Sequence, residues 1–130
     1  MTTSSPSSAG MLWTGRVLSG LGALALLASA AMKLSHSTQI VDSWTAFGFP
    51  IETLTPIGVE ELLSTILYLI PQTSLLGLVL LTGHLGGAIA THVHAGQNFA
   101  PPLIVALLVW GGLYLRESRL RALLPLRSQG

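Results

Sequence analysis

The fold is decided by residues 53–71, TLTPIGVEELLSTILYLIP, an apolar stretch that carries two adjacent carboxylates, Glu60 and Glu61. Its length suits a helix in a lipid bilayer, because about 20 residues rising 1.5 Å each cross the hydrocarbon. An unpaired carboxylate in hydrocarbon costs roughly 2.5–3.5 kcal/mol on insertion scales, so it requires a partner or a water-filled pocket. We therefore expect the rest of the chain to supply that partner and that pocket.

Composition indicates a membrane protein rather than a soluble domain. Half of the 130 residues are hydrophobic and 8% are charged, whereas about 25% are charged in a soluble domain. The chain contains no cysteine, which excludes disulfides, thiol redox chemistry and cysteine-ligated zinc or iron–sulfur clusters. A net charge of +1 leaves no basic face for phosphates, so no nucleic-acid partner is expected.

Three further apolar segments accompany the central one and predict an all-α fold, a bundle of four transmembrane helices. These segments are residues 13–32, 75–91 and about 103–115. Short connections between them imply antiparallel neighbours. Thr55 is the expected N-cap of the second span, with Pro56 at its first position.

The domain organisation follows from these segments. We expect a disordered tail at residues 1–11, a membrane domain at residues 12–119 and a basic cytoplasmic tail at residues 120–130. A cleaved signal peptide is the alternative for the first apolar segment, because Ala28-Ser29-Ala30 resembles a cleavage site.

Residues 35–50, between the first two spans, predict a short amphipathic helix in the membrane interface. Apolar residues recur there at helical spacing, and Trp44 suits headgroup depth. Gly48 and Pro50 follow as helix-ending residues. On the third span, Gly83-xxx-Gly87 and Gly86-xxx-Ala90 are spacings that permit close approach of a neighbouring backbone.

The arginines predict the orientation. Arg16 and the C-terminal arginines at 116, 119, 121 and 127 fall on one side of a four-span bundle, whereas Lys33 stands alone on the other. The positive-inside rule then places both termini in the cytoplasm of a multi-pass cell-membrane protein.

With this orientation, the ionisable residues of three spans meet at one depth near the outer side. Lys33 ends the first span, Glu60 and Glu61 begin the second, and His92 ends the third, with His84 nearer its middle. Glu61, Ser64, Thr65 and Tyr68 share one face of the second span, whereas Glu60 points about 100° away. The candidate ligand-binding or proton-handling residues are therefore Glu61, Lys33, His92, His84, Tyr68 and Glu60, with Glu61 inward and Glu60 at the rim.

Three kinds of chemistry fit this cluster. It could bind a small amphipathic or quinone-like molecule, whose oxygens a histidine and Glu61 would hold. A metal or haem site is disfavoured, because residues two apart, such as His92 and His94, face different ways on a helix. The third interpretation is structural: Lys33 pairs with Glu61, and the histidines lock the helices in register.

Several short motifs, taken together, resemble the DoxX-like family of small four-helix membrane proteins. They are Lys33-Leu34, Gly48-Phe49-Pro50, Gly58-x-x-Glu61-Leu62, Thr91-His92 and an arginine closing the last span, over residues 12–119. The resemblance implies a four-helix membrane bundle associated with respiratory or oxidative-stress redox complexes, including thiosulfate- or quinone-linked subunits. Glu60 beside Glu61 departs from the pattern.

We therefore expect a membrane protein that binds a small hydrophobic or quinone-type molecule in an outer-leaflet pocket. It would serve as a subunit of a redox system, without thiol or nucleotide chemistry of its own, and the sequence leaves open whether it is an enzyme. The alternatives are a non-catalytic scaffold or assembly subunit and, less favoured for want of an internal repeat, a small proton-coupled transporter. The partners to consider are the bilayer, another membrane or redox subunit, and a second copy of the chain.

Overall fold

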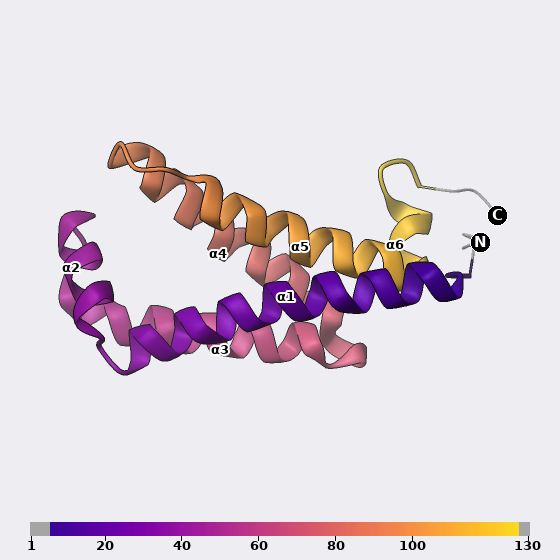
Figure 1. Cartoon of the computed structure of the whole chain (residues 1–130), viewed down its shortest axis with the longest axis horizontal. Helices are drawn as coiled ribbons and strands as arrows, with labels where there is room; N and C mark the ends of the chain where they lie inside the picture. The colour runs from indigo at the N-terminus through magenta and orange to yellow at the C-terminus, as the bar shows by residue number, and fades with distance from the viewer. Residues whose placement is uncertain (1–5, 128–130) are drawn as a thin grey trace.

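The computed structural model describes residues 6–127, and this part of the chain is α-helical without strands (Figure 1). The all-α prediction is thus confirmed. The α-helices are α1 (Ala9–Leu34), α2 (Thr38–Ala46), α3 (Leu54–Leu69), α4 (Ser74–His94), α5 (Ala100–Arg116) and α6 (Ser118–Leu123). Short 3-10 turns, η1 (Ile51–Thr53) and η2 (Pro71–Thr73), precede α3 and α4.

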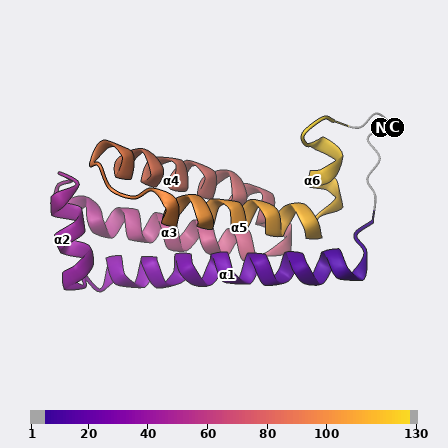
Figure 2. The same ribbon diagram turned by 45° about the horizontal axis from the view of Figure 1, so that its top comes forward.

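Four long helices, α1, α3, α4 and α5, lie side by side along the long axis (Figures 1 and 2). Helix α1 contacts α3 and α5, and α4 contacts the same two helices from the other side. The short helix α2 crosses one end of this bundle, which we call the α2 end. Helix α6 packs on α5 at the opposite end, where α1 begins and which we call the termini end.

Two helical segments are long and apolar enough to cross a membrane by themselves: Ala9–Leu34 and Pro71–His94. The third apolar helix, Ala100–Arg116, is shorter, and α3 has 16 residues. Length and composition therefore single out α1 and α4, each of which packs against the two shorter helices.

The ends of the chain are more helical than the sequence indicates. Helix α1 begins at Ala9, because the Ser8 side chain accepts a hydrogen bond from the backbone N–H of Met11. Residues 9–11 of the expected tail are therefore helical, and residues 1–5 lie outside the described residues. At the other end α6 lies partly within the expected basic tail and buries Leu120, whereas residues 128–130 are not described.

The start of α3 differs from the prediction, and the residue before it, Thr53, makes its side-chain hydrogen bonds outside the helix. Helix α3 begins at Leu54, so Thr55 is not its N-cap. The Thr53 hydroxyl donates to the carbonyl of Pro50 at 2.6 Å and accepts from Trp44 Nε1 at 2.9 Å. Trp44 is accordingly buried rather than exposed at a surface, and it ties α2 to the segment before α3.

Close backbone approach occurs at other glycines than those predicted. A Cβ at Gly77 would overlap the backbone of Tyr68, and one at Gly112 would overlap Ser19. A Cβ at Gly83, Gly86 or Gly87 would instead meet open space. The helices therefore press together near the termini end, and the small-residue spacings of α4 serve no contact within the described chain.

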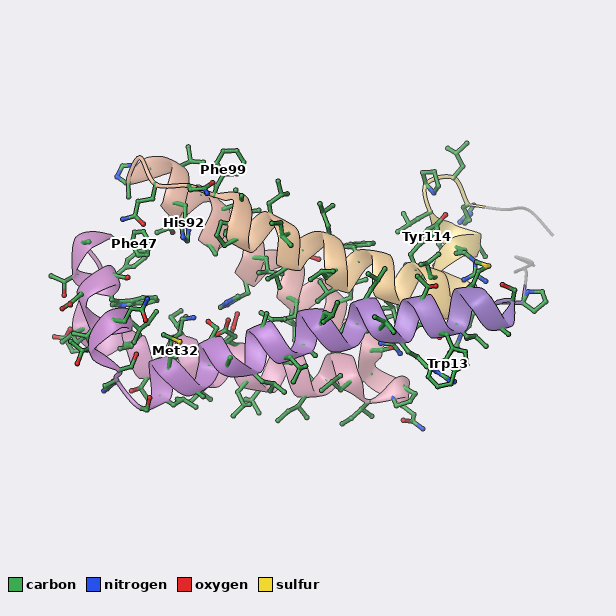
Figure 3. The ribbon with its side chains drawn as sticks, viewed as in Figure 1. Trp13, Met32, Phe47, His92, Phe99 and Tyr114 are labelled. Atoms are coloured by element: carbon green, nitrogen blue, oxygen red, sulfur yellow. The ribbon has the colours of Figure 1, made fainter. Side chains whose placement is uncertain are left out.

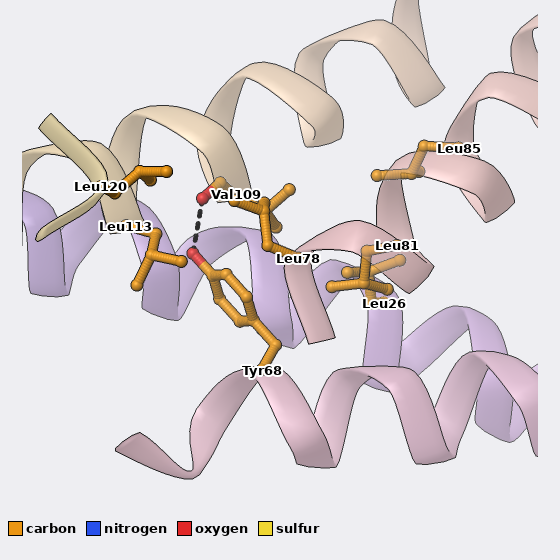
Figure 4. Close-up of a cluster of buried hydrophobic side chains, with 8 residues drawn as sticks. All are labelled: Leu26, Tyr68, Leu78, Leu81, Leu85, Val109, Leu113 and Leu120. Carbon is orange, nitrogen blue, oxygen red and sulfur yellow. Dashed lines mark hydrogen bonds between the residues drawn. The ribbon is translucent and has the colours of Figure 1, made fainter. Parts of the chain in front are cut away.

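The apolar core lies between the middle of the bundle and the termini end (Figure 4). It brings together side chains from α1, α3, α4, α5 and α6, namely Leu26, Tyr68, Leu78, Leu81, Leu85, Val109, Leu113 and Leu120. At the α2 end, this cluster of apolar side chains does not fill the space between the helices.

Candidate functional site

A cavity of about 610 Å³ lies at the α2 end, among α1, α3, α4 and α5 and beside α2. Figure 3 shows the side chains that surround this region of the bundle. Its polar lining includes Lys33, Glu60, Glu61, His84 and His92. Five of the six candidate residues from the sequence therefore line one cavity, although they come from three helices.

Glu61 is the buried centre of the polar wall, with 2% of its side chain exposed. Its Oε1 accepts hydrogen bonds from Lys33 Nζ at 2.9 Å and from Ser29 Oγ at 3.1 Å. Lys33 Nζ also donates to Ser29 Oγ at 2.7 Å. Ser29 and Lys33 can both reach the same carboxylate because residues four apart share a face of α1.

A glycine in α3 lets the two helices meet at this point. A Cβ built on Gly58 would lie 3.0 Å from Cβ of Lys33, so a larger residue would fit only if the Lys33 stem moved away slightly. Glu61 lies one turn further along α3, on the same buried side. The Gly58-x-x-Glu61 spacing thus brings the lysine of α1 alongside the carboxylate of α3.

His84 joins both carboxylates to α4. Its Nε2 lies 3.0 Å from Glu61 Oε2, and its Nδ1 lies 3.2 Å from Glu60 Oε1 and 3.0 Å from Glu60 Oε2. The His84 side chain is 9% exposed, whereas that of Glu60 is 43% exposed. Glu61 is therefore the inward carboxylate, and Glu60 lies at the rim but still contacts the cluster.

His92 lines the cavity without contacting the carboxylates. Its Nδ1 donates to the backbone carbonyl of Ala88 at 2.7 Å, so in the neutral ring Nε2 is an acceptor. Within the described chain no hydrogen bond to this Nε2 is found. The ring stacks at a tilt against Phe47, the residue that follows α2, with centroids 5.1 Å apart, and the two side chains point toward each other in Figure 3.

The wall formed by α2 and its flanks is aromatic and apolar. Trp44 and Phe49 are in ring contact, with centroids 5.0 Å apart, and both line the cavity together with Phe47. Leu26 and Ile57 add aliphatic surface. One wall of the cavity is thus charged and hydrogen-bonding, and another is aromatic.

Tyr68 is the candidate that does not join this site. Its hydroxyl donates to the Val109 carbonyl at 2.6 Å (Figure 4). The Ser19 hydroxyl therefore donates to the tyrosine oxygen at 2.8 Å. Arg116 Nε in turn donates to Ser19 Oγ at 3.0 Å, and its guanidinium carbon lies 5.4 Å from the centroid of the Tyr68 ring. Tyr68 therefore belongs to a second polar cluster, of Ser19, Tyr68 and Arg116, at the termini end.

The histidines do not converge on a metal position. Helix α4 continues to His94, which is exposed, so His92 and His94 point in different directions. Within residues 6–127 no group of three or more His, Cys, Asp or Glu residues is placed to hold a metal ion.

A sequence comparison places the chain in a family. The sequence model of the DoxX-like family matches residues 17–112. The chain belongs to the DoxX-like family. Membership in this family and the two long apolar helices together identify a membrane protein. Neither a curated protein nor a solved structure is significantly similar to this DoxX-like chain.

Two parts of the site are not predicted from the sequence. Ser29 looks like an ordinary small residue of an apolar helix, and only its spacing of four from Lys33 could have indicated its contact with Glu61. Phe47 and Phe49 look like membrane-interface residues, and their role as a cavity wall depends on how α2 folds back over the bundle. No local sequence pattern predicts that α2 folds back over the bundle.

Proposed function

We propose that this DoxX-like protein is a four-span membrane protein that binds a small, hydrophobic, ring-bearing molecule of the quinone type in the cavity at the α2 end. The observation that carries the proposal is the pairing, in one cavity of about 610 Å³, of a hydrogen-bonding wall with an aromatic wall. An amphipathic ring needs both: polar groups to orient its oxygens and apolar surface to cover its faces. Ubiquinone-like head groups have this chemistry.

Exposed apolar side chains support four spans. Each long helix presents a large aliphatic residue that is more than half exposed, namely Leu24, Leu63, Val79 and Leu107. Such surfaces on all four helices suit contact with lipid tails. At 16 residues, α3 rises about 24 Å, and the flanking turns η1 and η2 lengthen it toward the roughly 30 Å of a hydrocarbon core.

Both termini would lie in the cytoplasm. The termini end carries Arg16, Arg116, Arg119 and Arg121, whereas Lys33 at the α2 end is neutralised by Glu61. The positive-inside rule then places the cavity toward the outer leaflet. Helix α1 would remain in the mature protein, because it contributes Ser29 and Lys33 to the site and packs along α3 and α5.

A redox role would require a partner. The chain has no cysteine, so electrons would pass through a bound quinone to or from another subunit. The protein would then hold the ring in place and exclude lipid from it, and the partner would supply the electron carrier.

Titration with a short-chain ubiquinone tests the proposal, using purified protein in lipid nanodiscs. Adjacent glycines offer a matched pair of variants: Gly87 lines the cavity and Gly86 does not, and both have open space beside them. Quinone should raise the melting temperature of the wild type and of Gly86→Leu. It should bind Gly87→Leu at least tenfold more weakly. Equal binding to both variants, or none to the wild type, would refute the proposal.

A non-catalytic scaffold is the second candidate. It is favoured by the mutual satisfaction of Lys33, Ser29 and Glu61, which resembles a structural lock between α1 and α3. A scaffold would be recovered from membranes with a partner subunit or a second copy and without any small molecule. A proton-coupled transporter ranks below both, since the sequence has no internal repeat of the kind that alternating access often uses.

A further inference from the structure

The imidazole of His84 lies between two carboxylates, one at each ring nitrogen. Glu61 Oε2 is 3.0 Å from Nε2, and Glu60 Oε1 is 3.2 Å from Nδ1. The two carboxylates come from adjacent positions of α3, so a single side chain of α4 bridges both. Ring nitrogens this close to oxygen require a hydrogen atom in each contact.

Two hydrogen bonds in this bridge need one more proton than its groups usually carry. Ionised carboxylates only accept hydrogen bonds, and a neutral imidazole carries a single N–H. Two contacts between three such groups require two protons. The additional proton resides either on the ring, which is then an imidazolium, or on one carboxyl group.

The surrounding charges favour this additional proton. The titratable residues lining the cavity are Lys33, Glu60, Glu61, His84 and His92. Without the additional proton, Lys33 faces two carboxylates and the cluster has a net charge of −1; with it the net charge is zero. Neutrality matters here, because a net charge is costly in a low-dielectric interior. Lining residues from α2 and α5, such as Ser43 and Val105, add no titratable group.

We propose that Glu60, His84 and Glu61 together form a binding site for one exchangeable proton. Glu60, whose side chain is the most exposed of the three although its Oε2 is buried, takes up the proton from water, and His84 carries it to the cavity wall beside buried Glu61. If a ligand oxygen in the cavity accepts the proton from this trio, Glu60 replaces it from water, so that the proton count is restored. That donor role rests on the proposed function, whereas the bound proton does not.

Nitrogen-15 NMR of protein labelled at histidine, in nanodiscs at pH 7, tests the site. His84→Gln assigns the His84 signals by their loss. We expect two protonated ring nitrogens in His84, and in His92 a single N–H at Nδ1, since Nδ1 donates to a carbonyl. A neutral His84 ring also supports the site if the infrared spectrum shows a carboxylic acid band that Glu60→Gln or Glu61→Gln removes.

Removing one carboxylate provides the matched comparison. Glu60→Gln should leave His84 with one N–H, because the amide can donate to Nδ1 and the additional proton is no longer needed. His92 should be unchanged in the same spectrum. A wild-type His84 with one N–H and no carboxylic acid band would overturn the proton site. Because no quinone is added, that result is independent of whether the cavity binds one.

Discussion

The two ends of the bundle use polar residues in the same way but pack around them differently. Glu61 and Tyr68 lie seven residues apart on one buried face of α3, and each accepts hydrogen bonds from α1. Around Tyr68, Gly77 and Gly112 bring backbones into contact and close the space. Around Glu61, Gly83 and Gly87 face open space and the cavity remains. Packing is therefore one difference between the cavity at the α2 end and the closed cluster around Tyr68 at the termini end.

The charges at the two ends differ as well. At the termini end, the hydrogen bonds run in one direction, from Arg116 through Ser19 and Tyr68 to the Val109 carbonyl, and no carboxylate takes part. At the α2 end, Lys33 and His84 converge on Glu61 from two helices. The first arrangement fixes a geometry, whereas the second can also gain or lose a proton.

The largest effect on stability is expected at the α2 end, from Lys33→Met. This change removes the lysine partner of buried Glu61 and leaves His84 as its remaining basic neighbour, and breaking a buried ion pair costs about 3–5 kcal/mol. The free energy of unfolding, measured by denaturant titration in micelles, should fall by that amount. The double variant Lys33→Met, Glu61→Leu should recover much of the loss. A single variant as stable as the wild type would show that the pair is not buried.

At the termini end, Gly77→Ala should be the most damaging small change. Its Cβ would overlap the backbone of Tyr68, which cannot rotate away as a side chain can. Overpacking of this kind costs about 1–3 kcal/mol. Gly83→Ala is the control, because the same methyl group meets open space at the α2 end. Similar melting temperatures for the two variants would contradict the contrast between a closed and an open end.

Tyr68→Phe should have a comparable effect on stability and none on ligand binding. It removes a hydroxyl that satisfies both Ser19 and the Val109 carbonyl, and leaving buried groups unpaired costs about 1–3 kcal/mol. Quinone affinity should not change, because Tyr68 does not line the cavity. Tenfold weaker binding by a folded Tyr68→Phe protein would mean that the two clusters are coupled.

His92→Gln should have the smallest effect on stability and a selective effect on binding. Its contacts are a hydrogen bond within α4 and the ring of Phe47, so unfolding should change by less than about 0.5 kcal/mol. Nε2 accepts a hydrogen bond, so it can hold the hydroxyl of a reduced quinone, a quinol. The loss of Nε2 should weaken quinol binding by about tenfold, equivalent to about 1.4 kcal/mol. Unchanged affinity would remove His92 from the binding wall.

The sequence predicts the parts of this fold that depend on spacing within one helix. The apolar segments, the inward position of Glu61 and the convergence of Lys33, Glu61 and His84 all follow from helical periodicity and from the cost of a charge in lipid. Tyr68 was predicted to share the face of Glu61, and it does. It lies about 10 Å further along the axis, where a different set of helices meets.

What the sequence does not indicate depends on contacts between helices. The glycine spacings of α4 looked like a packing surface, yet the close contacts form at Gly77 and Gly112, whose partners are distant in the sequence. The sequence suggests that Trp44 is a membrane-interface residue, yet its side chain is buried and donates a hydrogen bond to Thr53, just before α3. Such pairings are fixed only once the helices are placed.

The most direct test of the account is native mass spectrometry of the protein purified from its own membrane, compared with Gly87→Leu and Gly86→Leu. If the open end is a binding cavity, the wild type and Gly86→Leu should retain a small hydrophobic molecule, and Gly87→Leu should lose it. If all three proteins carry no molecule, or all carry the same one, the cavity is not the binding site, and the polar groups at the α2 end only hold the helices together.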